Sequence, residues 1–254
     1  MKIRIIRYTL MAIVLGLVIY LALGYGQRSF EAWCPFGGVE SLWGLFTAGE
    51  FNCALGALNL SMMVAVLILA LVAKKSFCGW ACPIGFVGEI FGRIGNKIFR
   101  KKTHPGPRLN NILKLVRYPL LAIFLYLTYN AAELIYRGYD PYYLIFSGFG
   151  HGSLGMVSYI VLGVMTIGAF LIPMFFCRYL CPLGAVLDPF SRVGLAKVTR
   201  DEQSCTDCGL CQVSCPHDIP VQNRLKVRDR DCTNCLECIE ACPEDGVLSL
   251  RANL

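Results

Sequence analysis

The sequence predicts a mostly α-helical membrane protein: a polytopic four-helix membrane domain made of two parallel internal repeats, followed by a small α+β domain. Three observations predict this fold class. The chain of 254 residues is 56% apolar and only 16% charged, and its mean hydropathy of +0.54 is high for a soluble domain. A ten-residue motif recurs about a hundred residues later. Eight of the fourteen cysteines lie in two evenly spaced runs near the C-terminal end.

Four apolar segments are long enough, or nearly so, to cross a bilayer core of ~30 Å as helices of about 20 residues. They cover residues 8–25, 54–73, 116–132 and 155–176. The first resembles a signal peptide, because Lys2, Arg4 and Arg7 precede its apolar run. The run is long and has no clear small-residue cleavage site before Arg28, so we expect a retained anchor.

Lys and Arg residues predict the orientation, because they collect in cytoplasmic loops. They lie near the N-terminus, at Lys74 and Lys75, and in the segment from residue 93 to residue 117. The two other connections carry only Arg28 and Arg137. Both termini are therefore expected on the cytoplasmic side.

The charge divides between the two expected domains. Residues 1–199 contain 18 basic and 7 acidic side chains, a net charge of +11, whereas residues 200–254 contain 6 and 10, a net charge of −4. The basic residues fit membrane topology and contact with anionic lipid. The basic residues of the membrane domain could also form a docking face for an acidic redox partner. Beyond the positive charge, no feature of the sequence indicates binding to nucleic acid.

The tail, residues 200–254, contains two runs with the spacing Cys-x2-Cys-x2-Cys-x3-Cys-Pro, beginning at Cys205 and at Cys232. This is the pattern of bacterial ferredoxins with two [4Fe-4S] clusters, in which the fourth cysteine of each run binds the other cluster. One predicted ligand set is therefore Cys205, Cys208, Cys211 and Cys242. The other is Cys232, Cys235, Cys238 and Cys215.

Two alternatives compete with redox clusters in the tail: a zinc site, and a cluster that only holds the fold. Eight cysteines in this order favour redox clusters over both. A segment of about 55 residues can bury little apolar surface, so we expect it to be unfolded without iron.

The repeated motif reads FCGWACPIGF at residues 77–86 and FCRYLCPLGA at residues 176–185. Each half of the membrane domain reads helix, outer loop, helix and then Cys-x3-Cys-Pro. Because the halves run in the same direction, the repeat axis is expected along the membrane normal. Cysteines four apart share one helix face, so four thiols should meet near that axis. They belong to Cys78, Cys82, Cys177 and Cys181.

Three roles stay open for these four membrane cysteines. A third iron–sulfur cluster of unspecified type is our preferred hypothesis. The alternatives are two reversible dithiols, Cys78 with Cys82 and Cys177 with Cys181, or buried cysteines that only pack.

The outer loops, residues 33–53 and 139–152, are where a quinone head group or a periplasmic partner could bind. Quinol oxidation needs a proton acceptor near an apolar, aromatic pocket, and Glu40 and His151 are the candidates. The alternative for each is a solvated loop residue or a hydrogen-bonded cap.

Cys34 and Cys53 are not a symmetric ligand set. Cys34-Pro35 matches Asp140-Pro141 only with a gap, and the second half has no cysteine equivalent to Cys53. A disulfide across the outer loop is expected in an oxidising compartment. A redox-active pair near the quinone site and free buried thiols are the alternatives.

The four helices, the CGWACP and CRYLCP motifs and the twin cysteine runs together resemble the NapH/MauN family of membrane-bound ferredoxin-type 4Fe-4S proteins. More distant resemblances are to the C-terminal region of NosR and to CcoG-like polyferredoxins. The resemblance covers nearly the whole chain and implies electron transfer in a bacterial cytoplasmic (inner) membrane, linking the quinone pool to redox enzymes. The chain lacks the flavin-binding extension of NosR-like proteins, which favours a small subunit of an oxidoreductase complex.

We therefore expect a membrane-anchored iron–sulfur subunit that passes electrons between quinone and a periplasmic or cytoplasmic redox partner. The alternative, which the resemblance to CcoG suggests, is an accessory protein that reduces thiols or metal ions during metalloenzyme assembly. The sequence indicates neither the direction of electron flow nor the partner.

Overall fold

The computed structural model describes residues 2–24, 35–48, 56–99, 105–131, 139–146 and 156–252, and most of them are helical. The membrane part contains α1 (Lys2–Gly24), α2 (Pro35–Ala48), α3 (Gly56–Ala73), α4 (Ser76–Trp80), α5 (Pro83–Ile98), α6 (Pro107–Leu115), α7 (Arg117–Ala131), α8 (Pro141–Phe146), α9 (Met156–Leu171), the π-helix η4 (Phe176–Leu180) and α10 (Pro182–Val193). The tail contains β1 (Ala196–Arg200), α11 (Leu210–Ser214), the 3-10 helix η5 (Val221–Asn223), α12 (Glu237–Glu240) and β2 (Leu248–Ala252).

Three helical stretches in the described ranges are long and apolar enough to cross a membrane: Lys2–Tyr20, Gly56–Ala73 and Arg108–Asn130. Ser158–Leu171 is a shorter apolar helix. Each of the four exposes large apolar side chains at the molecular surface, as expected for contact with lipid tails. The predicted apolar helices are therefore present, and a fourth full span stays a prediction.

The apolar helix α9 ends at Leu171, before the predicted end of the fourth segment at residue 176. Pro173 has no backbone N–H to continue the helical hydrogen bonds, and Met174 adopts the left-handed conformation with φ of 56°. Lys74 adopts the same conformation, with φ of 61°, after α3. Both halves therefore turn sharply between the apolar helix and the cysteine motif.

A helix occupies much of the segment predicted as the first outer loop. α2 lies against α3, and a Cβ atom at Gly38 would be 2.3 Å from the carbonyl oxygen of Asn59. Glycine at this position therefore lets the two helices pack backbone to backbone. The loop assignment overlooked this because glycines and aromatic residues also occur in loops.

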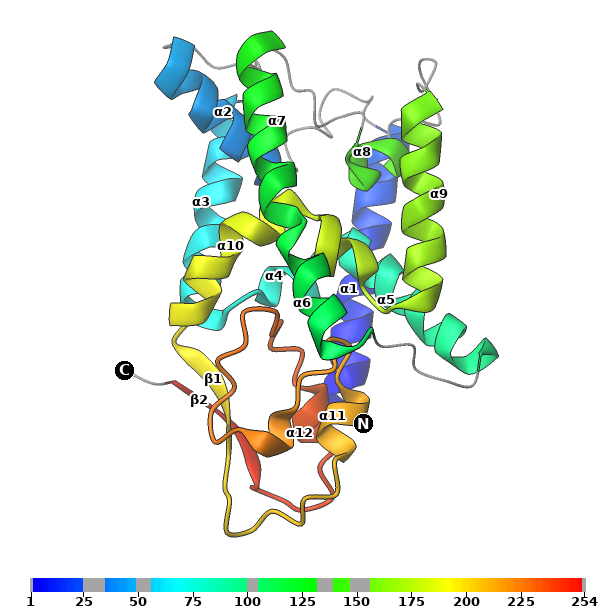
Figure 1. Ribbon diagram of the computed structural model, residues 1–254, viewed down its shortest axis with the longest axis vertical. Helices are drawn as coiled ribbons and strands as arrows, with labels where there is room; N and C mark the ends of the chain where they lie inside the picture. Colours follow the sequence, from blue (N-terminus) through cyan, green and yellow to red (C-terminus); the bar gives the residue numbers. More distant parts are fainter. Residues whose placement is uncertain are drawn as a thin grey trace.

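Figure 1 shows the helices of the membrane part above the tail, with the N-terminus beside α11 and α12. α5 packs against α9, and α10 packs against α3 and α7. Each helix that follows a Cys-x3-Cys-Pro motif therefore contacts the apolar helix of the other half. This exchange brings the two motifs together.

An apolar cluster joins the halves on the α3 side, where burial of each large side chain stabilises the fold by roughly 1.5–3 kcal/mol. Its members come from α2, α3, α7 and α10: Phe36, Val66, Ala70, Phe124, Leu183 and Leu187. Cys78 and Cys181 pack against this cluster. The first residues of α2 therefore lie close to the cysteine motifs.

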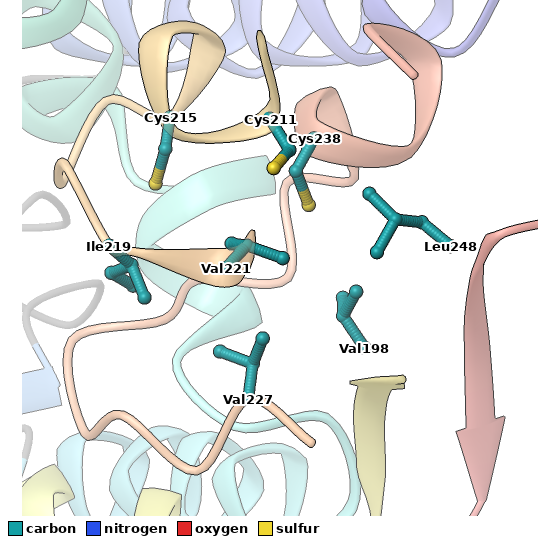
Figure 2. Packing of buried hydrophobic residues seen from close by; sticks show 8 residues of the cluster. All are labelled: Val198, Cys211, Cys215, Ile219, Val221, Val227, Cys238 and Leu248. Atoms are coloured by element: carbon teal, nitrogen blue, oxygen red, sulfur yellow. The ribbon is translucent and has the colours of Figure 1, made fainter. Parts of the chain in front are cut away.

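The tail is closed by a two-stranded antiparallel sheet in which β1 pairs with β2, with Val198 opposite Leu250. β1 begins at Ala196, a few residues before the predicted domain boundary at residue 199. Figure 2 shows three cysteines and five aliphatic side chains gathered in the interior: Cys211, Cys215, Cys238, Val198, Ile219, Val221, Val227 and Leu248. Cysteines make up much of this small core, as expected for a domain that depends on bound metal.

Candidate iron–sulfur centres

The two copies of the membrane motif have nearly the same local geometry. Cys78 lies in α4 and Cys177 in η4, and an extended cysteine follows each short helix, directly after η4 and one residue later, after Ala81, in the case of α4. That cysteine is Cys82 in the first half, with φ of −75° and ψ of 115°, and Cys181 in the second, with −73° and 114°. The proline that follows each begins the next helix, where a missing N–H is tolerated. The proline therefore marks the start of a new helix in both halves.

Glycine two positions after that proline lets the next helix approach the cysteine-bearing turn. A Cβ atom at Gly85 would lie 2.4 Å from the carbonyl oxygen of Cys78. At Gly184 the equivalent separation from the carbonyl oxygen of Cys177 is 3.3 Å. The glycine requirement is therefore strict in the first half and weaker in the second.

The four membrane cysteines lie close enough together for their charges to interact, and none of them forms a disulfide. Burial raises the pKa of the thiols of Cys78, Cys82 and Cys177, and raises that of Cys181 to about 12. The positive charge of Lys75 opposes this shift at three of them. Four thiolates in such a site need further positive charge, which metal ions supply.

Within the described ranges, no three Cys, His, Asp or Glu side chains converge as ligands of one metal ion. In a cluster each thiolate binds a different iron atom, so its ligands need not converge on a single point.

In the tail, the eight cysteines line two cavities of similar size. One cavity is lined by Cys215, Cys232, Cys235 and Cys238. The other is lined by Cys205, Cys208, Cys211 and Cys242. In each case three cysteines of one run meet the fourth cysteine of the other run. We call these the proximal and the distal cavity.

The proximal cavity is the more buried of the two. Burial raises the pKa of all four of its thiols, that of Cys235 to about 11, whereas Cys208 of the distal cavity is exposed. His217 also lines the proximal cavity, is 5% exposed, and has no hydrogen-bond partner on either ring nitrogen. Burial, helped by the positive charge of Arg178, lowers the pKa of His217 to about 4. A neutral, buried ring N–H can donate a hydrogen bond to sulfur, so the residues present fit a bound cluster.

The membrane motif touches the loop that carries the proximal cysteines. A Cβ atom at Gly79 would lie 2.9 Å from the Cβ of Thr233 and 3.0 Å from its carbonyl oxygen. Trp80 Nε1 donates a hydrogen bond of 2.9 Å to the carbonyl oxygen of Asn234. Gly79 follows Cys78, and Thr233 follows Cys232, so the two sets of cysteines are joined through one backbone contact. We call this contact the Gly79–Thr233 junction.

Buried ion pairs hold the tail against the membrane part beside this junction. Lys75 Nζ lies 2.7 Å from Asp188 and 3.6 Å from Asp231. Arg117 contacts the same two carboxylates at 2.8 Å and 3.1 Å. Lys114 Nζ lies 2.5 Å from Asp231. The charges of these cations keep the pKa of Asp231 far below its ordinary value.

A second buried network, of arginines and glutamates, joins the tail to the membrane part. Arg7 pairs with Glu89 and, at 3.2 Å, with Glu237 of α12. Arg93 lies 2.9 Å from Glu89 and 2.5 Å from Glu237. The backbone N–H of Arg4, in the first turn of α1, donates to Glu240 at 2.9 Å. Much of the basic face assigned to topology and lipid contact is therefore paired with the chain's own acidic tail.

The two networks repeat one arrangement in the two halves. In each half an Arg-Tyr pair, at residues 7–8 and 117–118, contacts a buried acid that follows the cysteine motif, Glu89 or Asp188. Each buried acid is joined through the Arg to an acid of the tail. Sequence reasoning missed these residues. The matched acids align at the offset near 100 that aligns the cysteine motifs, but the Arg-Tyr pairs lie about ten residues further apart than that offset.

Comparisons with known proteins test this arrangement. A profile described as a 4Fe-4S binding domain matches residues 55–102 and again residues 154–200, so both membrane motifs fall within it. A profile described as a 4Fe-4S dicluster domain matches residues 197–243. MJ0750 of Methanocaldococcus jannaschii, an uncharacterized protein, is 32% identical over 67% of this chain and 70% of its own length. The chain belongs to the NapH/MauN-type family of ferredoxin-like 4Fe-4S proteins.

Other relatives carry names that describe electron transport. YccM of Escherichia coli (strain K12), an electron transport protein by name, is 34% identical over 78% of this chain and 57% of its own length. The ferredoxin-type protein NapH of the same strain is 27% identical over 66% of the chain and 59% of its own length. The chain thus spans less than two thirds of the length of these two relatives. No solved structure matches it.

Of the quinone-site candidates in this NapH/MauN-type protein, only Glu40 lies in the described part. It is 2% exposed on α2 and accepts a hydrogen bond of 2.9 Å from Thr128 of α7. It is therefore a buried carboxyl group within the helices and not a solvated loop residue. His151, Cys34 and Cys53 lie outside the described residues.

Asp140 is a residue that sequence reasoning did not select. It is 6% exposed, directly precedes α8, and its charge acts on the thiols of Cys82 and Cys181. The signal was its position before Pro141, where the first half has Cys34 before Pro35. Because Cys34-Pro35 aligns with Asp140-Pro141 only when a gap is allowed, the sequence analysis did not select Asp140 as a site residue.

Proposed function

We propose that this protein is a membrane-anchored electron-transfer subunit that links the membrane quinone pool to a redox partner through iron–sulfur centres. Family membership supports iron–sulfur electron transport. The link to quinone and the identity of the partner are the parts that we propose.

We assign one [4Fe-4S] cluster to the four cysteines of the proximal cavity, a second to those of the distal cavity, and a third iron–sulfur cluster to the four membrane cysteines. The lining of the two tail cavities supports the first two assignments. The match of one 4Fe-4S profile to both membrane motifs supports the third. When bound, the clusters supply one-electron redox chemistry, and the protein sets their separation, burial and charge.

The observation that carries this proposal is the Gly79–Thr233 junction. It puts the membrane cysteines next to the proximal set, while the distal set has the exposed Cys208. The chain's own residues thereby define an order: membrane set, proximal set, distal set. Such an order suits transfer between a lipid-soluble carrier at one end and a partner on the aqueous side at the other.

We further propose that the protein is a multi-pass component of the bacterial cytoplasmic membrane, with four spans in two parallel repeats and both termini cytoplasmic. The contact of α1 with α12 supports this orientation, because it places the N-terminal end on the same side as the tail. The basic residues gathered at that side fit the positive-inside rule.

Reoxidation of reduced protein by quinone tests the function. The whole protein, purified without oxygen and reconstituted in lipid vesicles, would be reduced with dithionite, freed of excess reductant and mixed with decylubiquinone. Two reduced centres then give one electron each to the quinone, and two protons from water complete the quinol. Recovery of the visible absorbance of the oxidised clusters follows the reaction.

Two glycine variants give this experiment its control. Gly79→Val forces the junction apart, whereas Gly163→Val adds a side chain where no atom lies within 4 Å. We expect rapid reoxidation in the parent and in Gly163→Val, and slower reoxidation in Gly79→Val at unchanged iron content. Clusters that quinone does not reoxidise would contradict the proposed function. Reoxidation by a disulfide or a metal ion, but not by quinone, would support the accessory role.

A further inference from the structure

Lys74 is a buried cation in the turn between the apolar helix α3 and the first cysteine motif. It is 0% exposed, and its Nζ donates hydrogen bonds of 2.7 Å and 3.0 Å to the backbone carbonyl oxygens of Val227 and Asp229. Both acceptors lie in the segment that leads to the proximal cysteine Cys232. The stem of the side chain is enclosed too, because a Cβ atom at Gly194 would lie 2.8 Å from its Cγ.

The charge of Lys74 is not neutralised by an ion pair. In the part of the chain that the structure describes, its Nζ bonds to the two carbonyl groups, and no carboxylate lies within 4 Å of it. The next residue, Lys75, differs, because it pairs with Asp188 and Asp231. Taking an ammonium group out of water is costly unless an opposite charge lies nearby. Lys74 therefore needs another source of negative charge.

The proximal cysteines supply that charge. Burial lowers the pKa of Lys74, and the negative charge of Cys232 opposes this shift more strongly than that of Asp229, which lies 3.7 Å from Arg224. Burial raises the pKa of the Cys232 thiol, and the positive charge of Lys74 gives the largest opposing effect. Lys197 and Arg224 are like charges that repel Lys74. A set of four thiolates bound to iron, with its net negative charge, suits a buried ammonium group in this position.

The distal cavity has different surroundings. Of the described residues that line it, Arg200 is the one cation, and its guanidinium group lies 3.0 Å from Asp207 and 3.7 Å from Glu202. Glu244 also lines this cavity and adds negative charge. An unneutralised buried cation is thus found beside the proximal set and not among the residues that line the distal cavity.

We propose that Lys74 raises the reduction potential of the proximal cluster by placing an unneutralised positive charge beside it. The inference rests on the proposed function, because it takes the proximal cysteines to bind a cluster. One-electron reduction adds one negative charge at the proximal cavity and makes or breaks no covalent bond. A buried cation nearby stabilises that added charge, since the interior screens charges poorly. Lys74 thereby favours an electron at the cluster next to the Gly79–Thr233 junction.

A redox titration of the tail clusters tests this role without quinone or a partner. The whole protein in nanodiscs, purified without oxygen, would be poised with dithionite and ferricyanide through mediators and followed by electron paramagnetic resonance. Signals lost in Cys235→Ser and in Cys208→Ser identify the proximal and the distal cluster. Lys74→Met removes the charge and introduces the residue type that the second half has at its own left-handed turn, Met174. We expect the equilibrium constant for reduction of the proximal cluster to fall roughly tenfold, about 59 mV for one electron, and that of the distal cluster to stay unchanged.

Two further variants separate the charge of Lys74 from its hydrogen bonds. Lys74→Arg keeps the charge and should leave the proximal potential close to that of the parent. Lys74→Gln keeps a hydrogen-bond donor without the charge and should lower the potential as Lys74→Met does, so it decides the matter if Lys74→Met loses iron.

Three results would overturn the proposal and leave Lys74 as a structural contact. They are an unchanged proximal potential in the neutral variants, an equal fall in Lys74→Arg, and loss of the proximal cluster from both neutral variants. A parent protein without a proximal cluster signal would instead contradict the proposed function, so the two failures are distinguishable.

Discussion

Asp231 is the carboxylate on which docking of the tail depends most directly. It is 2% exposed and lies 2.5 Å from Lys114, 3.1 Å from Arg117 and 3.6 Å from Lys75. Asp231→Asn keeps the size of the side chain and removes its charge. The three cations then lose a partner in a site from which water is largely excluded, and we expect the tail to separate more readily from the membrane part.

The expected loss follows from the geometry. Breaking a buried ion pair by removing one partner costs about 3–5 kcal/mol, because the other charge is left buried. Lys75 and Arg117 keep Asp188, at 2.7 Å and 2.8 Å, so the lower end of that range applies. A loss of about 3 kcal/mol corresponds to a roughly hundredfold change in the equilibrium between docked and separated states.

Hydrogen–deuterium exchange on the iron-loaded protein in nanodiscs measures this change. Amides of residues 227–234, which lie at the junction, should exchange roughly a hundred times faster in Asp231→Asn. Glu202→Gln is the matched control, because Glu202 is 70% exposed and its pair with Arg200, at 3.7 Å, is a surface contact of little expected value. Equal exchange in the two variants would refute the reasoning that buried pairing docks the tail.

Three further predictions follow from the same contacts. Burial opposes ionisation of Glu89, but Arg7 and Arg93 hold its pKa below the ordinary value, so the ionised carboxylate stabilises the fold above about pH 4.5 and this stabilisation is lost as the pH falls through the lowered pKa. The thermal unfolding temperature of Glu89→Gln should therefore depend less on pH than that of the parent. Parallel curves of unfolding temperature against pH would contradict this. Cys215→Ser should remove the same cluster signal in electron paramagnetic resonance as Cys235→Ser, whereas loss of the signal that Cys208→Ser removes would reverse the ligand assignment. Gly85→Ala should lower iron content more than Gly184→Ala, because a Cβ atom meets a carbonyl oxygen at 2.4 Å in the first case and 3.3 Å in the second; equal iron content would contradict this.

The cysteine pattern predicted the tail well, because cluster ligands impose spacing on the sequence directly. Cys205 and Cys232 begin runs that allow one arrangement of thiols around two centres, and the structure puts the same eight residues around two cavities. The repeated motif predicted that four membrane thiols meet; the structure brings them close enough for their charges to interact, and their role as ligands stays a prediction. Apolar length predicted the membrane helices but not their ends, because the turns at Lys74 and Met174 are backbone conformations that hydropathy does not report.

Features that depend on partners far apart in the chain were not predictable in this way. The local sequence does not distinguish a cation that faces lipid from one that pairs with the tail, so the sequence analysis assigned Arg7 and Arg117 to membrane topology. It gave no role to Asp188. Glu40 lies in the helix α2, in a segment whose glycines led us to predict a loop.

The central claim is that the membrane cysteines hold a cluster that continues the path of the tail into the membrane. Iron and acid-labile sulfide per chain, with Mössbauer spectra, test it most directly on anaerobically purified parent protein and on a variant with Cys78, Cys82, Cys177 and Cys181 changed to Ser. Two ferredoxin-type clusters alone account for about eight irons. The account predicts that the parent exceeds this content and that the variant returns to it. Both samples at about eight irons would contradict the claim and leave these cysteines as dithiols or packing residues.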